Sequence, residues 1–234
     1  MDGANILVVD DDREIAGAIE KLLSIEGLNV TKAYDGMEAM EVLVNKNIHL
    51  IVMDVMMPKL DGLSATMKIR ENKNIPIIIL SAKSEDSDKV IGLSMGADDY
   101  VTKPFNPQEL VARVKSQLRR YMTLGDMKNL NNNSVIKVGS LSLDKDSKVL
   151  YVDGQQIRLT PTEFGIVELL MLNSGVVFSA EQIYERVWDE PAYSVENTVM
   201  VHIRRIREKI EINPKEPKYL KVVWGIGYKI EKLQ

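Results

Sequence analysis

The chain has no cysteine among its 234 residues, which excludes disulfide bonds and thiolate chemistry. It also has no apolar run close to the roughly 18 residues that a membrane-spanning helix needs. Its first residues lack a basic segment followed by a long apolar one, so no signal peptide is expected. We therefore predict a cytoplasmic protein without a membrane partner.

The chain also carries no large excess of charge of either sign, because its formal net charge is only -4. Residues 1–120 hold 15 basic and 19 acidic side chains, whereas residues 121–234 hold 15 of each. Phosphate contacts depend on where charge sits. A nucleic-acid partner would therefore need a local basic face in the second part of the chain.

Four short apolar runs in the first half each end in a polar side chain, which is typical of buried strands in a parallel sheet. The runs are Ile6–Val9, Leu50–Met53, Ile75–Leu80 and Asp99–Thr102, followed by Asp10, Asp54, Ser81 and Lys103. Amphipathic helical segments separate them, and Leu28–Ala33 is predicted to be a further strand. This alternation predicts a doubly wound five-stranded parallel sheet. Ligands bind such sheets at the carboxyl edge of the strands.

Three carboxylates, those of Asp10, Asp11 and Asp54, are expected at that edge. They would repel one another without a cation, and hard oxygen ligands suit Mg2+ or Mn2+. Ser81 adds a hydroxyl and Lys103 an ammonium group. This set suits phosphoryl transfer to Asp54, with the metal and Lys103 holding the negative oxygens.

Residues 1–121 resemble the receiver domain of two-component response regulators. The pieces that match are Asp10-Asp11, Asp54 in an Asp-x-x-Met-Pro-x-x-Asp-Gly pattern, Ser81-Ala82, Ala97–Tyr100 and Lys103-Pro104-Phe105. The resemblance implies that a partner histidine kinase phosphorylates Asp54.

The resemblance also assigns roles around Asp54. Asp10, Asp11, Asp54 and the backbone carbonyl of Met56 would hold Mg2+, and Lys103 would pair with the phosphoryl group through a loop with a cis Lys103-Pro104 peptide. Ser81 and Tyr100 would form the switch pair. Asp12 is predicted either to cap the helix that starts at Arg13, because its side chain can accept backbone N–H bonds, or to lie behind the metal-binding acids and support them.

Other flavodoxin-like domains are the alternatives for this half, including a flavin binder or a small phosphatase. A phosphatase of the haloacid-dehalogenase type would want a second Asp two residues after the first, and that position holds Met56. A glycine-rich phosphate loop after the first strand is also missing. Both observations favour the receiver.

Residues 122–134 are predicted to be a linker, because turn formers replace the hydrophobic periodicity of the helix expected over Pro107–Tyr121. Short β segments follow from Val135, and Asp153-Gly154 is a hairpin signal. A capping box at Thr160-Pro-Thr-Glu163 starts a helix, and another helix starts near Ser179. A helix over residues 195–212 and a hairpin around Trp224 complete a winged helix-turn-helix pattern over residues 135–234.

The helix over residues 195–212 has two different faces. Val199, Ile203, Ile206 and Ile210 form one apolar stripe. A second face holds Thr198, Val201, His202 and Arg205, flanked by Arg204 and Arg207. His202 is not expected to bind a metal, since the only other histidine, His49, lies in the other half.

Residues 135–232 resemble the OmpR/PhoB-type DNA-binding domain through Leu159–Phe164, Val199–Arg207 and Gly225–Tyr228. The resemblance implies base contacts in the major groove and phosphate contacts beside it. The base contacts would come from Thr198, Val201, Arg205 and Arg207, and the phosphate contacts from Asn197, His202 and Arg204. Some relatives read the minor groove with a wing Arg, but this chain has Trp224 there, so that contact is in doubt.

The OmpR/PhoB resemblance further implies a symmetric dimer of receiver domains with cross-subunit ion pairs. By position, Lys89 would face Glu109 and Asp99 would face Arg113. The complete expected face consists of Lys89, Asp98, Asp99, Glu109, Arg113 and Arg120. Within the family the chain is similar to regulators of the VanR type, although no motif fixes that.

Together these patterns predict a two-component response regulator, not an enzyme, whose phosphorylation promotes dimerisation and binding to promoter DNA. Its expected partners are a sensor histidine kinase, double-stranded DNA, a second copy of the chain and RNA polymerase. A transcription regulator that binds DNA without phosphorylation is the main alternative. An adaptor that binds only RNA polymerase or another protein also remains open, and so do the stimulus and the operator.

Overall fold

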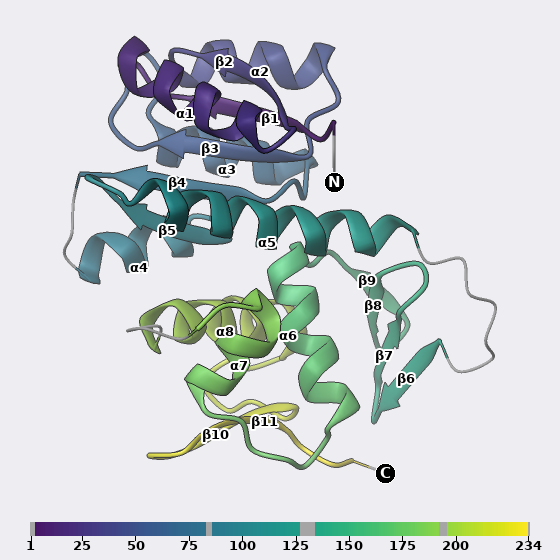
Figure 1. Ribbon diagram of the computed structural model, residues 1–234. Coiled ribbons are helices and arrows are strands. Elements are labelled where there is room, and N and C mark those ends of the chain that lie inside the picture. The colour runs from purple at the N-terminus through teal and green to yellow at the C-terminus, as the bar shows by residue number, and fades with distance from the viewer. Residues whose placement is uncertain (1–2, 83–85, 127–133, 192–195, 234) are drawn as a thin grey trace. The chain divides into compact units, whose positions relative to one another are not determined.

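The computed structural model describes residues 3–82, 86–126, 134–191 and 196–233 (Figure 1). Contacts divide the chain into two compact units, Met1–Met122 and Thr123–Gln234, which are described separately. No helix in the described ranges is long and apolar enough to span a membrane.

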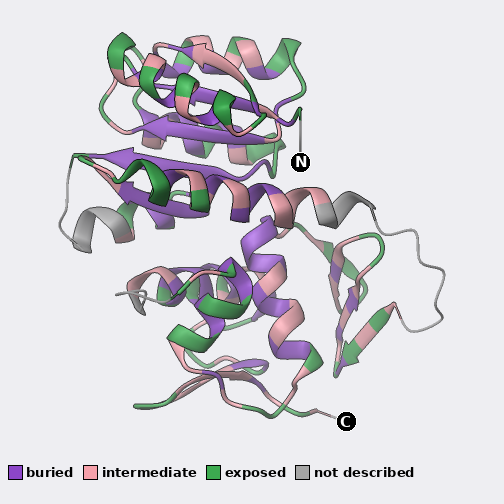
Figure 2. Cartoon of the chain, viewed as in Figure 1, coloured by how far each residue is buried: buried purple, intermediate pink, exposed green. Residues whose placement is uncertain are grey.

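The first unit is a five-stranded parallel sheet with the strand order β2-β1-β3-β4-β5. Its buried strands stand out in purple in Figure 2. The strands are β1 (Asn5–Val9), β2 (Asn29–Ala33), β3 (Leu50–Asp54), β4 (Ile77–Ser81) and β5 (Asp99–Thr102). The helices are α1 (Arg13–Ile25), α2 (Gly36–Asn45), α3 (Gly62–Asn72), α4 (Asp86–Ser94) and α5 (Pro107–Asp126). The predicted doubly wound receiver fold is confirmed.

Local sequence signals set the helix starts. Asp12 caps α1, because its side chain accepts N–H bonds from Glu14 and Ile15. Asp35 and Asp61 cap α2 and α3 in the same way. These caps place each helix directly after the carboxyl end of a strand, where the expected functional side chains lie.

The fifth helix differs from its prediction. It was expected to end at Tyr121, but α5 continues to Asp126. The first residues of the predicted linker 122–134 are therefore helical, while residues 127–133 lie outside the described residues. A helix does not have to end where its hydrophobic periodicity becomes weak, as long as no Pro or capping Gly ends it. Gly125 does not act as such a cap, because α5 continues to Asp126.

The second unit begins with an antiparallel sheet and continues with three helices and a hairpin. The sheet comprises β6 (Val135–Val138), β7 (Leu141–Asp144), β8 (Val149–Val152) and β9 (Gln155–Ile157). The other elements are α6 (Pro161–Leu172), α7 (Ala180–Trp188), α8 (Glu196–Ile210), β10 (Leu220–Val223) and β11 (Gly227–Ile230). The winged helix-turn-helix arrangement follows the predicted order.

One apolar core joins these elements. The predicted stripe of α8 is buried, with Val199, Ile203, Ile206 and Ile210 packed in the same cluster as residues of α6 and α7. The capping box predicted at α6 is present, since Thr160 and Glu163 exchange side-chain and backbone hydrogen bonds. The caps and the buried stripe hold α8 against the other two helices.

Candidate functional site

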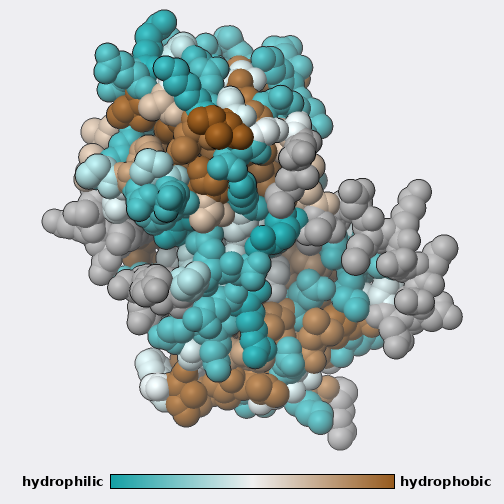
Figure 3. Space-filling view, viewed as in Figure 1, coloured by the Kyte–Doolittle hydropathy of each residue, from teal (hydrophilic) through white to brown (hydrophobic). Residues whose placement is uncertain are grey.

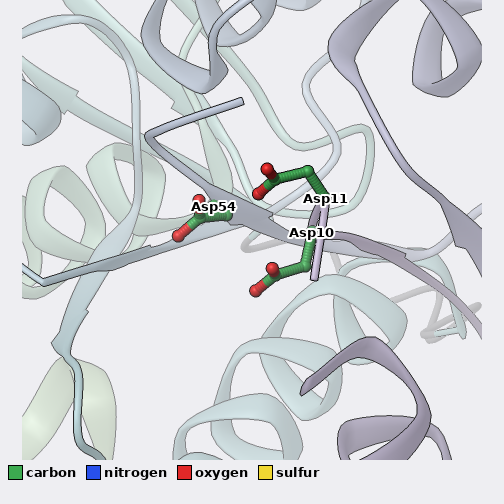
Figure 4. Close-up of side chains that lie close together, drawn as sticks. All are labelled: Asp10, Asp11 and Asp54. Atoms are coloured by element: carbon green, nitrogen blue, oxygen red, sulfur yellow. The ribbon is translucent and has the colours of Figure 1, made fainter. Parts of the chain in front are cut away.

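Three carboxylates meet at the carboxyl edge of the first sheet (Figure 4). Asp10 and Asp11 follow β1 and Asp54 ends β3, and these two strands pair in parallel with Val9 opposite Met53. One ligand oxygen from each acid lies within 4.8 Å of the others. Asp10 and Asp54 are buried, whereas Asp11 is exposed. The parallel register therefore brings together residues 44 positions apart, as the sequence predicted.

Lys103 reaches the same cluster from the end of β5. Its Nζ lies 2.6 Å from Oδ2 of Asp10 and 2.7 Å from Oδ1 of Asp54. The backbone N–H of Lys103 donates to the carbonyl of Ser81 (2.7 Å), which ties its loop to β4. The Lys103-Pro104 peptide is cis, as predicted. One ammonium group thus serves two carboxylates.

The electrostatics of this cluster favour an additional cation. Burial raises the pKa of Asp54 above its ordinary value, the charge on Asp10 adds to this, and Lys103 opposes it. Burial alone would lower the pKa of Lys103, but hydrogen bonds to Asp10 and Asp54 outweigh it and raise that pKa. A hard divalent cation fits the three carboxylates, because it would neutralise charge that a single lysine leaves unbalanced.

Gly62 also shapes the site, although no sequence pattern indicates this role. A Cβ added there would lie 1.9 Å from the carbonyl oxygen of Asp54, and the Gly62 N–H donates to the carbonyl of Val55. Only glycine allows the start of α3 to lie this close to Asp54. Asp61 and Gly62 end the Asp-x-x-Met-Pro-x-x-Asp-Gly pattern around Asp54. The pattern alone does not show that a side chain at position 62 would collide with the backbone of Asp54.

The expected switch residues lie on β4 and β5, the two strands that follow β3 in the sheet. Ser81 ends β4 and is buried, and Asp54 pairs with Leu80, the residue before it. Tyr100 lies on β5 with its ring against α4, where a Cβ on Gly92 would lie 3.2 Å from the ring. Tyr100 therefore connects β5 to α4 by side-chain packing.

The expected dimer face needs one correction. Asp98 is fully buried, and its Oδ2 accepts hydrogen bonds from Arg70 (2.6 Å) and from the N–H of Ile77 (3.0 Å). It ties α3 to the sheet instead of facing a partner. Asp98 lies in the bend just before β5, and its contact with Arg70, 28 residues away, could not be read from the local sequence.

The other members of that face are placed as follows. Arg113 donates to both carboxylate oxygens of Asp99 (2.9 and 3.0 Å) and to Glu109 (2.9 Å) within the same chain. Arg120 donates to Gln117 (3.1 Å). The side chain of Lys89 lies outside the described residues. The pair expected between two subunits, Asp99 with Arg113, thus forms within one chain in this structure.

The face of α8 expected to read DNA is more buried than the sequence suggested. Arg205 is 8% exposed and its guanidinium lies 3.0 Å from Glu163, while His202 packs against the ring of Trp188. Val201 is also buried. The expected base or phosphate contacts of these three residues conflict with their burial. A helix packed on two neighbours buries a wider arc than one apolar stripe predicts.

A different stripe of α8 is open to solvent. Met200 and Arg204 are exposed, and Asn197 and Thr198 are half-buried. Arg204 pairs with its neighbour Glu208 on the same helix (3.0 Å). Arg207 is half-buried, and its Nε donates to the carbonyl of Leu220 at the base of the hairpin (2.9 Å). Of the expected contact residues, Arg204 is thus exposed, and Asn197, Thr198 and Arg207 are half-buried.

Glu163 was identified only as a capping residue, but it also holds α8. Its carboxylate pairs with Arg205 (3.0 Å) and Lys209 (2.5 Å) and accepts the N–H of Thr160 (2.8 Å). Burial would raise the pKa of Glu163, but the two cations outweigh it and hold the pKa below its ordinary value. This link spans 46 residues, so no local pattern could reveal it.

A carboxylate cluster of this kind on a doubly wound sheet, joined to a winged helix-turn-helix unit, defines a two-component response regulator that binds DNA and regulates transcription. Family comparison agrees, because residues 6–115 match the response regulator receiver domain and residues 154–230 match the C-terminal domain of transcriptional regulatory proteins. The chain belongs to the OmpR/PhoB family of response regulators.

Individual relatives support this membership over nearly the full chain. The regulatory protein VanR of Enterococcus faecium is 44% identical over 228 residues, covering 97% of this chain and 98% of that protein. VanRc of Enterococcus gallinarum is also 44% identical, with coverage of 97% and 98%. The crystal structure of DrrB, an OmpR/PhoB homolog from Thermotoga maritima, matches at 33% identity with a TM-score of 0.52, covering 98% of this chain and 99% of DrrB. The resemblance to VanR-type regulators is thereby confirmed.

Proposed function

We propose that Asp54 accepts a phosphoryl group from a sensor histidine kinase and that this modification switches the chain between two states of DNA binding. The observation that carries the proposal is the convergence of Asp10, Asp11 and Asp54 with Lys103 on two of the three carboxylates. A solvated surface cluster would not bury two acids at the end of a parallel sheet around a shared ammonium group.

In the proposed reaction an oxygen of Asp54 attacks the phosphorus, and the bond from phosphorus to the donor's leaving group breaks. Mg2+ held by Asp10, Asp11, Asp54 and the carbonyl of Met56 would neutralise phosphoryl oxygens when bound, and Mn2+ could take the same place. Lys103 would form an ion pair with the phosphoryl oxygens, since its ammonium group already lies 2.7 Å from Oδ1 of Asp54. Ser81 would donate a hydrogen bond to the same group.

The kinase would approach over an apolar hollow of about 670 Å³ beside this cluster. Its walls come from α1 and from the loop after β5, including Ile15, Ala18, Leu22, Pro104 and Phe105. Figure 3 shows the hydrophobic surface over α1 in brown. The apolar face of a kinase helix could lie in this hollow. Because the hollow adjoins Lys103, the helix would then hold the kinase's phosphoryl group close to Asp54.

Phosphorylation would reorient Ser81 and Tyr100 and favour a dimer through α4, β5 and α5. Lys89, Asp99, Glu109, Arg113 and Arg120 would form the pairs between subunits. The pairs that Arg113 makes within one chain would then exchange for pairs with the second copy. Two linked DNA-binding units raise apparent affinity for paired half-sites through effective concentration.

The second unit would bind the DNA major groove through the exposed stripe of α8. Asn197 and Arg204 would contact phosphates and Thr198 a base edge. Arg207 would contribute from the base of the hairpin. Val201, His202 and Arg205 would support the helix from its buried side. RNA polymerase is the proposed further partner of the bound dimer.

The test uses the full chain with acetyl phosphate and Mg2+. Intact mass should increase by one phosphoryl group in the wild type and in Asp12→Asn, which alters only a helix cap, but not in Asp54→Ala. DNA selected by the wild type from a random-sequence duplex library is then titrated with treated and untreated protein. Affinity that rises only with a modified Asp54 supports the switch, whereas equal affinity in all samples indicates a regulator that binds DNA without phosphorylation.

A further inference from the structure

The loop between β3 and α3 starts directly at Asp54 and is fixed there to the sheet. The N–H of Val55 donates to the carbonyl of Leu80 in β4 (3.1 Å), and the carbonyl of Val55 accepts the N–H of Gly62 (3.0 Å). The N–H of Met56 donates to Oδ2 of Asp54 (3.1 Å). These bonds hold the first residues of the loop beside the carboxylate cluster.

The far side of the same loop is held by the start of α2. The N–H of Gly36 donates to the carbonyl of Leu60 (3.1 Å), and a Cβ added at Gly36 would lie 2.5 Å from that oxygen. Beside this close approach, Nζ of Lys59 lies 2.5 Å from Oδ2 of Asp35. A backbone hydrogen bond and an ion pair therefore join two loops that lie 24 residues apart in the sequence.

The ion pair lies at a strained point of the loop. Lys59 has a φ of 63°, which is uncommon for a residue with a side chain, and the N–H of Leu60 closes a tight turn by donating to the carbonyl of Pro58 (2.8 Å). Asp35 is buried and uses both oxygens, since its Oδ1 accepts the N–H of Glu38 (2.9 Å) and caps α2. Strained backbone persists where surrounding contacts determine it, and the Asp35–Lys59 pair is such a contact.

We propose that Asp35 and Lys59 are positioning residues for the metal, because their ion pair holds the loop so that the Met56 carbonyl stays in place to bind Mg2+. This inference rests on the proposed function, in which that carbonyl is one of the ligands. The other proposed ligands are carboxylates at the ends of buried strands, whereas the carbonyl lies on the loop itself, three residues before Lys59. Partners that orient metal ligands typically change metal affinity by roughly 10–100-fold when they are removed.

Conservative variants can remove the ion pair and leave the backbone as it is. Asp35→Asn loses the charge but keeps a side chain that can cap α2. Lys59→Asn loses the ammonium group, and Asn tolerates a left-handed backbone. Lys59→Arg keeps the cation. Glu20→Gln is the matched control, because it removes the 2.5 Å ion pair that joins Glu20 of α1 to Lys32 of β2.

Calorimetric titration of the full chain with Mg2+ measures metal affinity without a phosphoryl donor. Asp35→Asn and Lys59→Asn should each bind Mg2+ about tenfold more weakly than the wild type. The double variant should bind no more weakly than either single one, since all three lack the same pair. Lys59→Arg and Glu20→Gln should bind like the wild type.

Phosphorylation by acetyl phosphate separates a positioning role from a loss of stability. At constant ionic strength and low Mg2+, the two Asn variants should be modified more slowly than the wild type, and saturating Mg2+ should restore the rate. A receiver that was merely destabilised would stay slow at every Mg2+ concentration. That result, or an equal loss of Mg2+ affinity in Glu20→Gln, would overturn the inference.

The same experiment distinguishes failure of the inference from failure of the proposed function. A wild type that binds Mg2+ and accepts the phosphoryl group, together with Asn variants that bind Mg2+ equally well, would overturn the positioning role alone. A wild type that neither binds Mg2+ nor accepts the phosphoryl group would contradict the proposed function, and the inference would fail with it.

Discussion

Two clusters of charged side chains in this protein, around Asp54 and around Glu163, differ in how their charges are balanced. Asp54 shares one ammonium group with Asp10 at the carboxyl edge of the sheet. Glu163 is buried and receives two cations from α8. In the first arrangement one cation faces three carboxylates, whereas in the second two cations face one carboxylate. The Asp54 cluster therefore suits the proposed phosphoryl transfer, and the Glu163 cluster holds α8 in place.

Replacing Glu163 tests that structural role. Glu163→Gln keeps the shape but removes the charge that Arg205 and Lys209 pair with, so it should cost the second unit about 3 kcal/mol of unfolding free energy at neutral pH. Both tryptophans lie in the second unit, so fluorescence-detected urea unfolding of the full chain reports on that unit.

The loss should depend on pH. The pKa of Glu163 is lowered in the folded state, so its ionised form contributes stability above its ordinary value of 4.5. That contribution is lost as the pH falls through the folded-state pKa. The difference between wild type and Glu163→Gln should therefore be constant near neutral pH and shrink in acid. A difference that does not change with pH would mean that the ion pairs contribute nothing.

At the scale of elements, the position of the wing depends on close backbone approach. The N–H groups of Phe178 and Tyr228 each donate to the other's carbonyl (2.9 Å), which fixes β11 to the segment before α7. A Cβ on Gly227 would lie 2.0 Å from the carbonyl oxygen of Phe178. The hairpin can stay in place only if position 227 has no side chain.

Gly227→Ala should therefore cost more than about 3 kcal/mol or displace the hairpin. Gly154→Ala is the matched control, because it has a positive φ of 80° but nothing within 4 Å of the added Cβ, so only backbone strain of about 1 kcal/mol is expected. Urea unfolding and the emission maximum of Trp224 measure both effects. Equal losses in the two variants would show that the contact with Phe178 is not close in solution.

At the scale of the whole molecule, the proposed switch joins a receiver to a DNA-binding unit through dimerisation. Light scattering on the full chain should give a monomer without treatment and a doubled mass after beryllofluoride and Mg2+ are added, while Asp54→Ala should stay monomeric. The dimer could bind two DNA half-sites at once, and this would raise its apparent affinity for DNA. A monomer under all conditions would contradict the dimer proposal.

Reversing the charge of Glu109 tests where the proposed dimer interface lies. Glu109→Lys should prevent the beryllofluoride-induced dimer, because its half-exposed carboxylate would face a basic side chain of the second copy. Glu20→Lys reverses a similarly exposed carboxylate on α1, where Glu20 pairs with Lys32, and should leave the dimer unchanged. If both variants dimerise like the wild type, the proposed face is wrong.

Local and periodic features were readable from the sequence alone. The strands were predicted because buried parallel strands are continuous apolar runs, and the helix caps at Asp12 and Thr160 because capping is a local interaction. The site around Asp54 was predictable since parallel strands bring their carboxyl ends to one edge. Each of these inferences needs only neighbours in sequence or a general property of parallel sheets.

Tertiary structure decided which charged residues face inward. Asp98 and Arg205 look like surface groups in the sequence, yet Arg70 and Glu163, far away along the chain, bind them in the folded units. The contacts that require Gly62 and Gly227 are likewise made with backbone atoms of other segments. Hydrophobic period determines which stripe of a helix is buried first, but the number of neighbours packed around the helix decides how wide the buried arc becomes. That number exists only once the chain is folded.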